Sequence, residues 1–144
     1  MADLEVTYRG TVYPWHCDHM GHMNVMWYVG KFDEATWQLF SSLGITPDYL
    51  RGQGRGMVAV EQKISYQREV NAGDVVLVRS TVLEVREKVI RFCHRMENAA
   101  TGEVAAVTVL TGVHIDTTAR RSCPMPPELV AAAQKMITDD DPGI

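Results

Sequence analysis

The chain has few cysteines, no long apolar run and no concentration of positive charge. Its three cysteines, Cys17, Cys93 and Cys123, are odd in number and widely spaced, which argues against a disulfide framework or a paired CxxC zinc site. No apolar run approaches the ~20 residues that a membrane span needs. Basic residues are scattered and the net charge is −4, so no basic stripe supports nucleic-acid binding. Residues 1–5 lack the basic and apolar regions of a signal peptide, and we therefore expect a cytoplasmic protein without membrane or nucleic-acid partners.

What is present fits one globular domain. The 144 residues are 46% hydrophobic and 22% charged, which is close to the average for such domains. We expect a single domain over residues 1–144, with its core at about 4–116 and a short helix and acidic tail at 124–144. No internal repeat divides the chain.

The hydrophobic pattern changes period along the chain. Apolar and polar residues alternate over 4–8, which predicts a strand that ends before Pro14. From Asn24 to Gly44, apolar residues recur at helical spacing, which predicts one long helix capped by these two residues. A glycine-rich segment predicts a flexible turn at 52–56. Further strands are expected around residues 58–66, 75–85, 90–96 and 107–115, then a helix at 128–136 and a solvated acidic tail at 139–141.

These elements predict an α+β fold. Four consecutive hairpin-like strands favour a largely antiparallel sheet. The long helix is more apolar than a helix on a protein surface, so we expect a curved sheet to wrap around it.

The loop at residues 15–24 is the candidate active site. It brings one carboxylate, Asp18, close to the free N–H groups at the start of the predicted helix. Cys17 could be a nucleophile, but cysteine is also a common small buried residue, which we favour. His16, Cys17, Asp18, His19 and His22 could bind zinc, but the chain has no second cluster to complete such a site, so we expect no metal.

Three motifs carry a resemblance to a known family. Residues 18–28 have the pattern D-x-x-G-H-x-N-x-x-x-Y, residues 32–35 F-x-E-A, and residues 66–74 Y-x-x-E-V-x-x-G-D. Together with the order of elements, they resemble the hot-dog-fold acyl-CoA thioesterases of the 4-hydroxybenzoyl-CoA thioesterase type over roughly residues 4–116. The resemblance implies a hot-dog fold and hydrolysis of an acyl-CoA thioester, with coenzyme A as part of the substrate and no further cofactor.

The resemblance also implies catalytic roles in the loop. Asp18 would be the catalytic carboxylate, either as nucleophile or as general base. The N–H of Val25 would stabilise the oxyanion. Asn24 could take part directly or only cap the helix, and Gly21 would allow close approach or a positive φ. His22 could orient Asp18 or the attacking water.

Substrate contacts are expected elsewhere in the chain. Trp27 and Tyr28 could wall an acyl pocket, although aromatic residues are by default part of a core or an interface. Part of the pocket, at residues 56–60 and thus including Met57 and Val58, would come from a partner subunit of a homodimer or homotetramer. The candidate contacts for the phosphates of coenzyme A are Arg86, Lys88 and Arg91.

Several alternatives stay open. Glu34 and Glu61 are second-choice catalytic acids. The chain could be a non-catalytic acyl-CoA-binding module instead of an enzyme. A hot-dog hydratase or dehydratase is disfavoured, because Met20 and Met23 stand where such enzymes have asparagine and histidine. The sequence does not choose the acyl group, nor between coenzyme A and an acyl carrier protein as its carrier.

Overall fold

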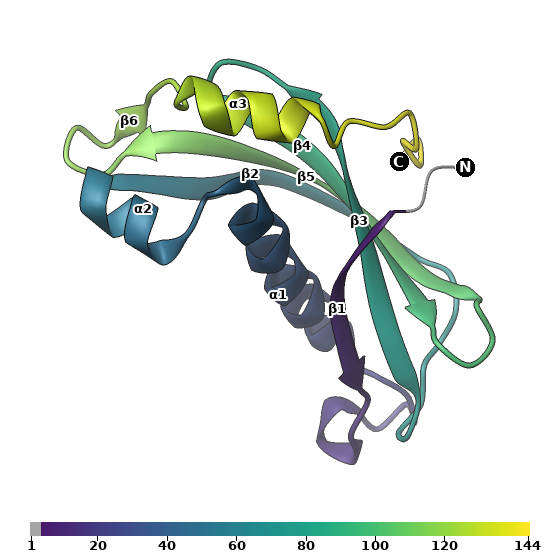
Figure 1. Ribbon diagram of the computed structural model, residues 1–144. Helices are drawn as coiled ribbons and strands as arrows, with labels where there is room; N and C mark the ends of the chain where they lie inside the picture. Colours follow the sequence, from purple (N-terminus) through teal and green to yellow (C-terminus); the bar gives the residue numbers. More distant parts are fainter. Residues whose placement is uncertain (1–3) are drawn as a thin grey trace.

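In the computed structural model, which describes residues 4–144, a curled antiparallel sheet wraps around one long helix (Figure 1). Residues 1–3, part of the segment read above for a signal peptide, lie outside the described residues. No helix of residues 4–144 is long and apolar enough to cross a membrane. The elements in chain order are β1 (Glu5–Thr11), η1 (Pro14–His16), α1 (Val25–Leu43), α2 (Pro47–Gln53), β2 (Arg55–Tyr66), β3 (Val75–Val85), β4 (Val89–Asn98), β5 (Val104–Asp116), β6 (Arg121–Ser122) and α3 (Pro127–Gln134).

The sheet has the strand order β1-β3-β4-β5-β2, with the short β6 beside β5. All neighbouring strands are antiparallel, as predicted. The prediction of four consecutive hairpins is wrong at one point, because β2 pairs with β5 and not with β3. The edge of β3 that a hairpin would need is occupied by β1, which pairs with it from Glu5 opposite Ser80 to Thr11 opposite Val75.

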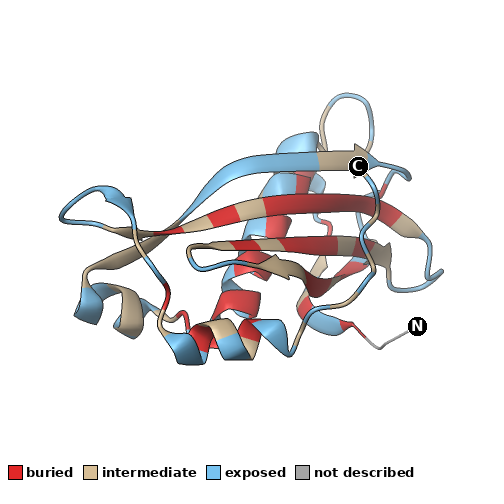
Figure 2. Ribbon diagram, turned by 90° about the horizontal axis from the view of Figure 1, so that it is seen from above, coloured by how far each residue is buried: buried red, intermediate tan, exposed pale blue. Residues whose placement is uncertain are grey.

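Helix α1 begins and ends where the sequence predicts. The side chain of Asn24 accepts a hydrogen bond from the N–H of Met26, and Gly44 ends the helix with φ 96°. One face of α1 is buried against the sheet, while Val25, Met26, Val29 and Trp37 are exposed. The edge strand β2 is also largely exposed, whereas the inner strands are buried (Figure 2). The helix is therefore buried on the side that faces the sheet, whereas its apolar composition predicted burial on most sides.

A layer of buried polar side chains separates two apolar clusters along α1. His94 lies at its centre, fully buried, with Nδ1 2.6 Å from the hydroxyl of Ser80 and Nε2 2.8 Å from that of Thr36. Thr7 extends this chain, since its hydroxyl is 2.6 Å from that of Ser80. Burial lowers the pKa of His94 to about 3, so the imidazole is neutral in the folded protein.

The segments outside this layer differ from the predictions in three places. Residues 47–53 form helix α2, where only the turn at 52–56 was predicted; Thr46 caps its start. Helix α3 agrees with the prediction, but its Leu129 and Ala133 are buried, so the core extends past residue 116. The acidic tail is not fully solvated, because Asp141 pairs with Arg91 at 3.0 Å.

Candidate active site

The loop between β1 and α1 is held tightly by its own backbone. The N–H of Asp18 donates to the carbonyl of His22 (3.2 Å), and the N–H of Gly21 donates to the carbonyl of Asp18 (3.0 Å). Gly21 has φ +90°, so the positive φ expected at this residue is confirmed. The N–H of Met23 donates to the carbonyl of Val70 (2.9 Å), which ties the loop to the segment between β2 and β3. These bonds fix the backbone of Asp18 just ahead of α1.

Two donors hold the carboxylate of Asp18. Its Oδ2 accepts from Nδ2 of Asn24 at 2.7 Å, and its Oδ1 accepts from the N–H of Met20 at 2.8 Å. The bond from Asn24, followed by that from Met20, keeps the pKa of Asp18 below its usual range. Asp18 is therefore ionised at neutral pH, and its orientation is set before any substrate arrives.

The side-chain amide of Asn24 forms two hydrogen bonds, one through its oxygen and one through its nitrogen. Its Oδ1 accepts from the N–H of Met26 at 2.9 Å and so caps α1, while its Nδ2 donates to Asp18. The contact that orients Asp18, for which His22 was one candidate, is thus made by Asn24. Nε2 of His22 instead lies 3.5 Å from Oε1 of Glu69. One signal could have shown this: an asparagine that caps a helix through its oxygen keeps its NH2 group free for a nearby acceptor.

The first residue of α1 has a free backbone donor. The N–H of Met26 is bound by the side chain of Asn24, and that of Trp27 by the carbonyl of Asn24 at 3.0 Å. Within residues 4–144, the N–H of Val25 has no hydrogen-bond acceptor. The positive end of the helix dipole adds to its pull on negative charge. Asn24 thus joins an oriented carboxylate to a free donor, and this arrangement suits attack on a carbonyl group.

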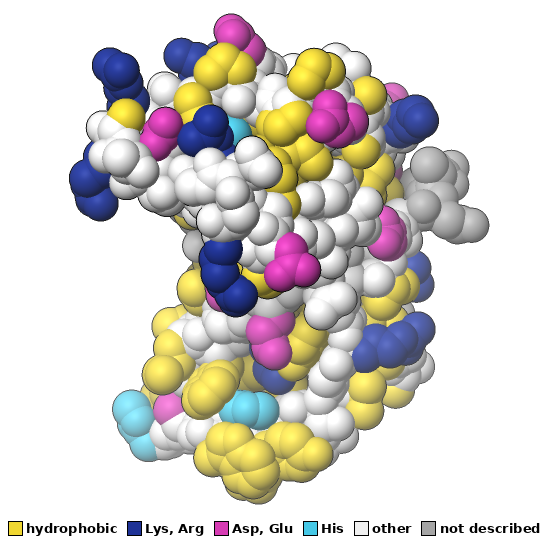
Figure 3. Space-filling view, turned by 60° about the vertical axis from the view of Figure 1, so that its left-hand side comes forward, with side chains coloured by type: hydrophobic (Ala, Val, Ile, Leu, Met, Phe, Trp, Pro, Cys, Tyr) yellow, Lys and Arg dark blue, Asp and Glu magenta, His cyan; other side chains and the backbone are white. Residues whose placement is uncertain are grey.

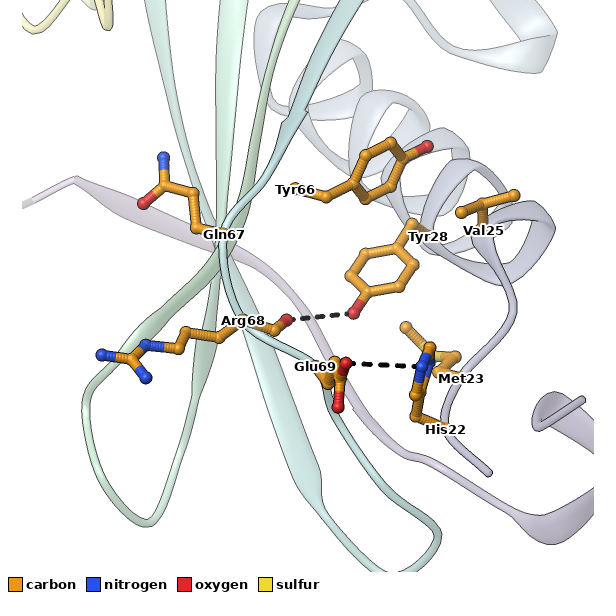
Figure 4. A pocket seen from close by; sticks show the side chains of 8 residues that line it. All are labelled: His22, Met23, Val25, Tyr28, Tyr66, Gln67, Arg68 and Glu69. Carbon is orange, nitrogen blue, oxygen red and sulfur yellow. Dashed lines mark hydrogen bonds and ion pairs between the residues drawn. The ribbon is translucent and has the colours of Figure 1, made fainter. Parts of the chain in front are cut away.

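A cavity of about 300 Å³, here called the tyrosine pocket, is lined in part by Val25, the residue that carries this free donor (Figure 4). The rings of Tyr28 and Tyr66 meet in it nearly at right angles, with centroids 5.2 Å apart and an interplanar angle of 87°. The hydroxyl of Tyr28 donates to the carbonyl of Arg68 at 3.2 Å. The pocket is lined by His22, Met23, Val25, Tyr28, Tyr66, Gln67, Arg68 and Glu69.

A second cavity, of about 420 Å³ and here called the tryptophan recess, lies between β1, η1 and α1. Tyr13 and Trp15 stack at its mouth with centroids 4.5 Å apart. Figure 3 shows a group of hydrophobic side chains at the lower end of the face in view. Desolvation and then the charge of Lys31 lower the pKa of the nearby His16. The recess is lined by Tyr8, Gly10, Thr11, Tyr13, Trp15, His16, Trp27, Gly30, Lys31 and Glu34. The two predicted acyl-pocket residues are therefore separated, with Tyr28 in one cavity and Trp27 in the other.

The other predicted substrate contacts lie away from Asp18 of the same chain. Met57 and Val58 line a narrow cavity beside the middle of α1, together with Trp37. The turn that carries Lys88 is at the far end of β3, whose eleven residues span about 35 Å. Within one chain, the structure does not bring these residues to the loop.

Two of the candidate phosphate contacts are already engaged. Arg86 pairs with Glu84, and Arg91 pairs with Asp141. The second-choice acids are both exposed: Glu34 lies at the tryptophan recess and Glu61 on β2. In the described part of the chain, no group of three or more histidine, cysteine, aspartate or glutamate side chains could hold a metal ion.

A curled antiparallel sheet around a long helix is the architecture of hot-dog-fold proteins. The chain belongs to the thioesterase-like superfamily, whose sequence profile matches residues 12–133. The predicted family and fold class are thereby confirmed.

Among characterised relatives, an L-carnitine dehydrogenase/betainyl-CoA thioesterase of Agrobacterium fabrum is 32% identical over 124 residues, covering 86% of this chain and 25% of the relative. This chain thus spans about a quarter of that protein's length. A betainyl-CoA thioesterase of Pseudomonas aeruginosa is 24% identical over 136 residues, which cover 94% of this chain and 86% of the relative.

Solved structures share the fold. A Staphylococcus aureus protein in complex with CoA aligns with a TM-score of 0.85 at 19% identity, covering 96% of this chain and 89% of that one. A 1,4-dihydroxy-2-naphthoyl-CoA thioesterase from Synechocystis aligns with a TM-score of 0.80 at 20% identity, covering 91% and 96%.

Proposed function

We propose that this protein hydrolyses the thioester bond of an acyl-CoA to give a carboxylic acid and free CoA. The observation that carries the proposal is the ionised carboxylate of Asp18, held by Asn24 next to the unpartnered N–H of Val25. Membership of the thioesterase-like superfamily supports the reaction type. The CoA complex of the Staphylococcus aureus structure supports CoA, ahead of an acyl carrier protein, as the carrier to test first.

Two routes use these groups. In the first, an oxygen of Asp18 attacks the thioester carbon, the C–S bond breaks, CoA leaves as a thiolate, and water hydrolyses the resulting mixed anhydride. In the second, Asp18 takes a proton from a water molecule while the oxygen of that water attacks the thioester carbon. CoA again leaves as a thiolate, which is then protonated. In both, the N–H of Val25 stabilises the oxyanion on the carbonyl oxygen.

The decisive experiment measures release of free thiol from a panel of acyl-CoA substrates. Exchange of Asp18 for asparagine removes the base or nucleophile, so we expect kcat to fall by about 10²–10⁴-fold with folding intact. Asp139→Asn makes the same change on the exposed C-terminal tail and is the matched control. If Asp18→Asn hydrolyses the panel as fast as the unmodified protein, the assignment of Asp18 is wrong. Binding of acyl-CoA without any thiol release would identify a non-catalytic binding module.

A single turnover in ¹⁸O-labelled water can identify the first route. Attack of water on the Asp18 side of an anhydride would leave the label in Asp18, where peptide mass spectrometry detects it. Attack on the acyl side of an anhydride and a general-base mechanism both send the label only into the acid product, so label in Asp18 is the result that identifies the anhydride.

A small acyl group carrying a quaternary ammonium, as in betainyl-CoA, is the first to test. Both relatives described above have betainyl-CoA thioesterase in their names. A pocket of about 300 Å³ is at the lower end of the ~300–1,000 Å³ typical of ligand sites, which favours a short acyl group.

We further propose that the protein works as a homodimer, or as a tetramer built from such dimers. Strand β2 is the last strand of the sheet and exposes Val58 and Val60, while α1 exposes Val29 and Trp37. A long edge strand and exposed apolar side chains favour association. A second copy would also supply the basic turn that lies too far from Asp18 within one chain.

Light scattering on the purified protein tests this assembly. Val60→Lys places a charge on the exposed edge, and we expect it to shift the protein toward monomers and to lower thioesterase activity in parallel. Thr101→Lys, in the exposed turn between β4 and β5, is the control. A monomeric protein with full activity would overturn the proposal.

A further inference from the structure

We propose that the tyrosine pocket selects acyl groups that carry a quaternary ammonium, and that Tyr66 and Glu69 are its specificity-determining residues. This inference rests on the proposed function, because it concerns the acyl group of the same substrate. The group is a trimethylated nitrogen two bonds from the thioester carbon, as in a betainyl thioester.

The two tyrosines form a corner of aromatic faces. Their rings are nearly perpendicular, so the face of one ring stands at right angles to the face of the other. A cation in such a corner contacts negative π surface on two sides, which is how quaternary ammonium groups are recognised. Tyr28 is fixed in place by burial and by its hydrogen bond to the carbonyl of Arg68, whereas Tyr66 is half exposed and available to a ligand.

The charges around the corner also favour a cation. Glu69 directs its carboxylate toward His22, and only its Oε1 takes part in that contact (Figure 4). The guanidinium of Arg68 extends away from the pocket in this view and lies 3.6 Å from Glu103. The pocket thus presents a carboxylate and two aromatic rings, while its permanently cationic side chain points elsewhere.

The pocket is in the right place for this group. Val25, which supplies the free N–H donor, is one of its lining residues. A thioester carbonyl bound to that donor has its acyl substituent within two bonds, so a trimethylammonium group enters the pocket without a long chain. The pocket's volume of about 300 Å³ suits a substituent of this size.

The tryptophan recess has aromatic walls as well, and besides the exposed carboxylate of Glu34 it already holds a buried cation. Lys31 is buried there, with Nζ 3.0 Å from the hydroxyl of Tyr8 and 5.3 Å from the centre of its ring. This ammonium would repel a second positive charge. Charge, and not aromatic content, therefore assigns the cationic acyl group to the tyrosine pocket.

The test compares betainyl-CoA with 3,3-dimethylbutyryl-CoA, in which carbon replaces the quaternary nitrogen and the shape is kept. We expect kcat/KM to be at least tenfold higher for betainyl-CoA. Glu69→Gln and Tyr66→Leu should each reduce this ratio several-fold, chiefly through KM, and Tyr66→Phe should restore it because the ring is retained. Glu103→Gln removes the same charge on the other side of Arg68 and should leave the ratio unchanged.

Each outcome decides the matter. Equal or faster hydrolysis of the neutral thioester overturns this inference and leaves the proposed thioesterase intact. If Trp15→Leu loses the ratio and Tyr66→Leu does not, the acyl group lies in the tryptophan recess and the inference is wrong. If no acyl-CoA is hydrolysed, the proposed function fails; calorimetric binding of the two thioesters then decides, and equal affinities overturn the selectivity.

Discussion

Burial of His94 predicts a defined loss of stability at mildly acidic pH. The hydroxyl of Thr36 donates to the carbonyl of Phe32, so in the neutral imidazole of His94 Nε2–H donates to Thr36 and Nδ1 accepts from Ser80. Among residues 4–144, no carboxylate forms a hydrogen bond with this imidazole. The pKa of His94 is about 3 in the folded protein and about 6.5 in an unfolded chain, so between these pH values the imidazole is protonated in the unfolded state and neutral in the folded state. The stabilisation from the neutral imidazole is therefore complete above pH 6.5 and is lost as pH falls toward about 3.

The size of this effect follows from the two pKa values of His94. The free energy of unfolding falls by about 2 kcal/mol between pH 6.5 and pH 5, and by about 5 kcal/mol at most near pH 3. A domain of this size is stable by about 5–15 kcal/mol, so even the first step is measurable. The window from pH 7 to 5 is best because most carboxylates titrate below it.

Urea denaturation at several pH values and one protein concentration measures this loss. His94→Gln keeps polar atoms in the layer but cannot take up a proton, so its stability should fall by about 2 kcal/mol less between pH 7 and 5 than that of the unmodified protein. Ser80→Ala should be less stable at every pH and keep the steep dependence, because the buried imidazole remains. Parallel curves for the unmodified protein and His94→Gln would refute the reasoning.

Two other variants test the helix ends. Asn24→Ser keeps a cap for α1 but loses the amide donor to Asp18, so the pKa of Asp18 should rise and the acid limb of the kcat/KM profile should move to higher pH; an unmoved limb would show that Asn24 does not set that pKa. Gly44→Ala should lower the free energy of unfolding by about 1–2 kcal/mol, because φ is 96° and the new Cβ would lie 3.1 Å from Leu129. Gly52→Ala, in open space on α2, is the control and should not lower it. Equal thermal midpoints for the two variants would contradict this prediction.

Sequence patterns located the elements because each pattern is local. The long apolar stripe of α1 and its caps Asn24 and Gly44 follow directly from helical periodicity. Helix α2 was missed for a physical reason: none of its residues is buried, so the segment has no apolar stripe to show. Strand pairing is not local, and the alternation of side chains along β2 is the same whether it pairs with β3 or with β5.

The same distinction applies to the site. Asp18, Asn24 and Val25 lie within eight residues of one another, and the sequence alone was enough to group them. The roles that the sequence suggested for His22 did not include a contact with Glu69, because folding brings Glu69 to His22 from a distant segment of the chain. Contacts between the loop and the segment after β2 could be identified only from the structure.

The neighbours Trp27 and Tyr28 show most clearly what the sequence leaves open. Adjacent residues on a helix project about 100° apart, so Tyr28 lines the tyrosine pocket and Trp27 lines the tryptophan recess, and the two do not form one wall. Aromatic content cannot decide which cavity takes the acyl group, because both have it. The deciding residues are Lys31, three positions further along the helix, and Glu69, more than forty residues away. Lys31 gives the recess a buried positive charge and Glu69 gives the tyrosine pocket a negative one. Exchanging the charge on one wall should therefore change which acyl groups the proposed thioesterase accepts while the aromatic rings stay in place.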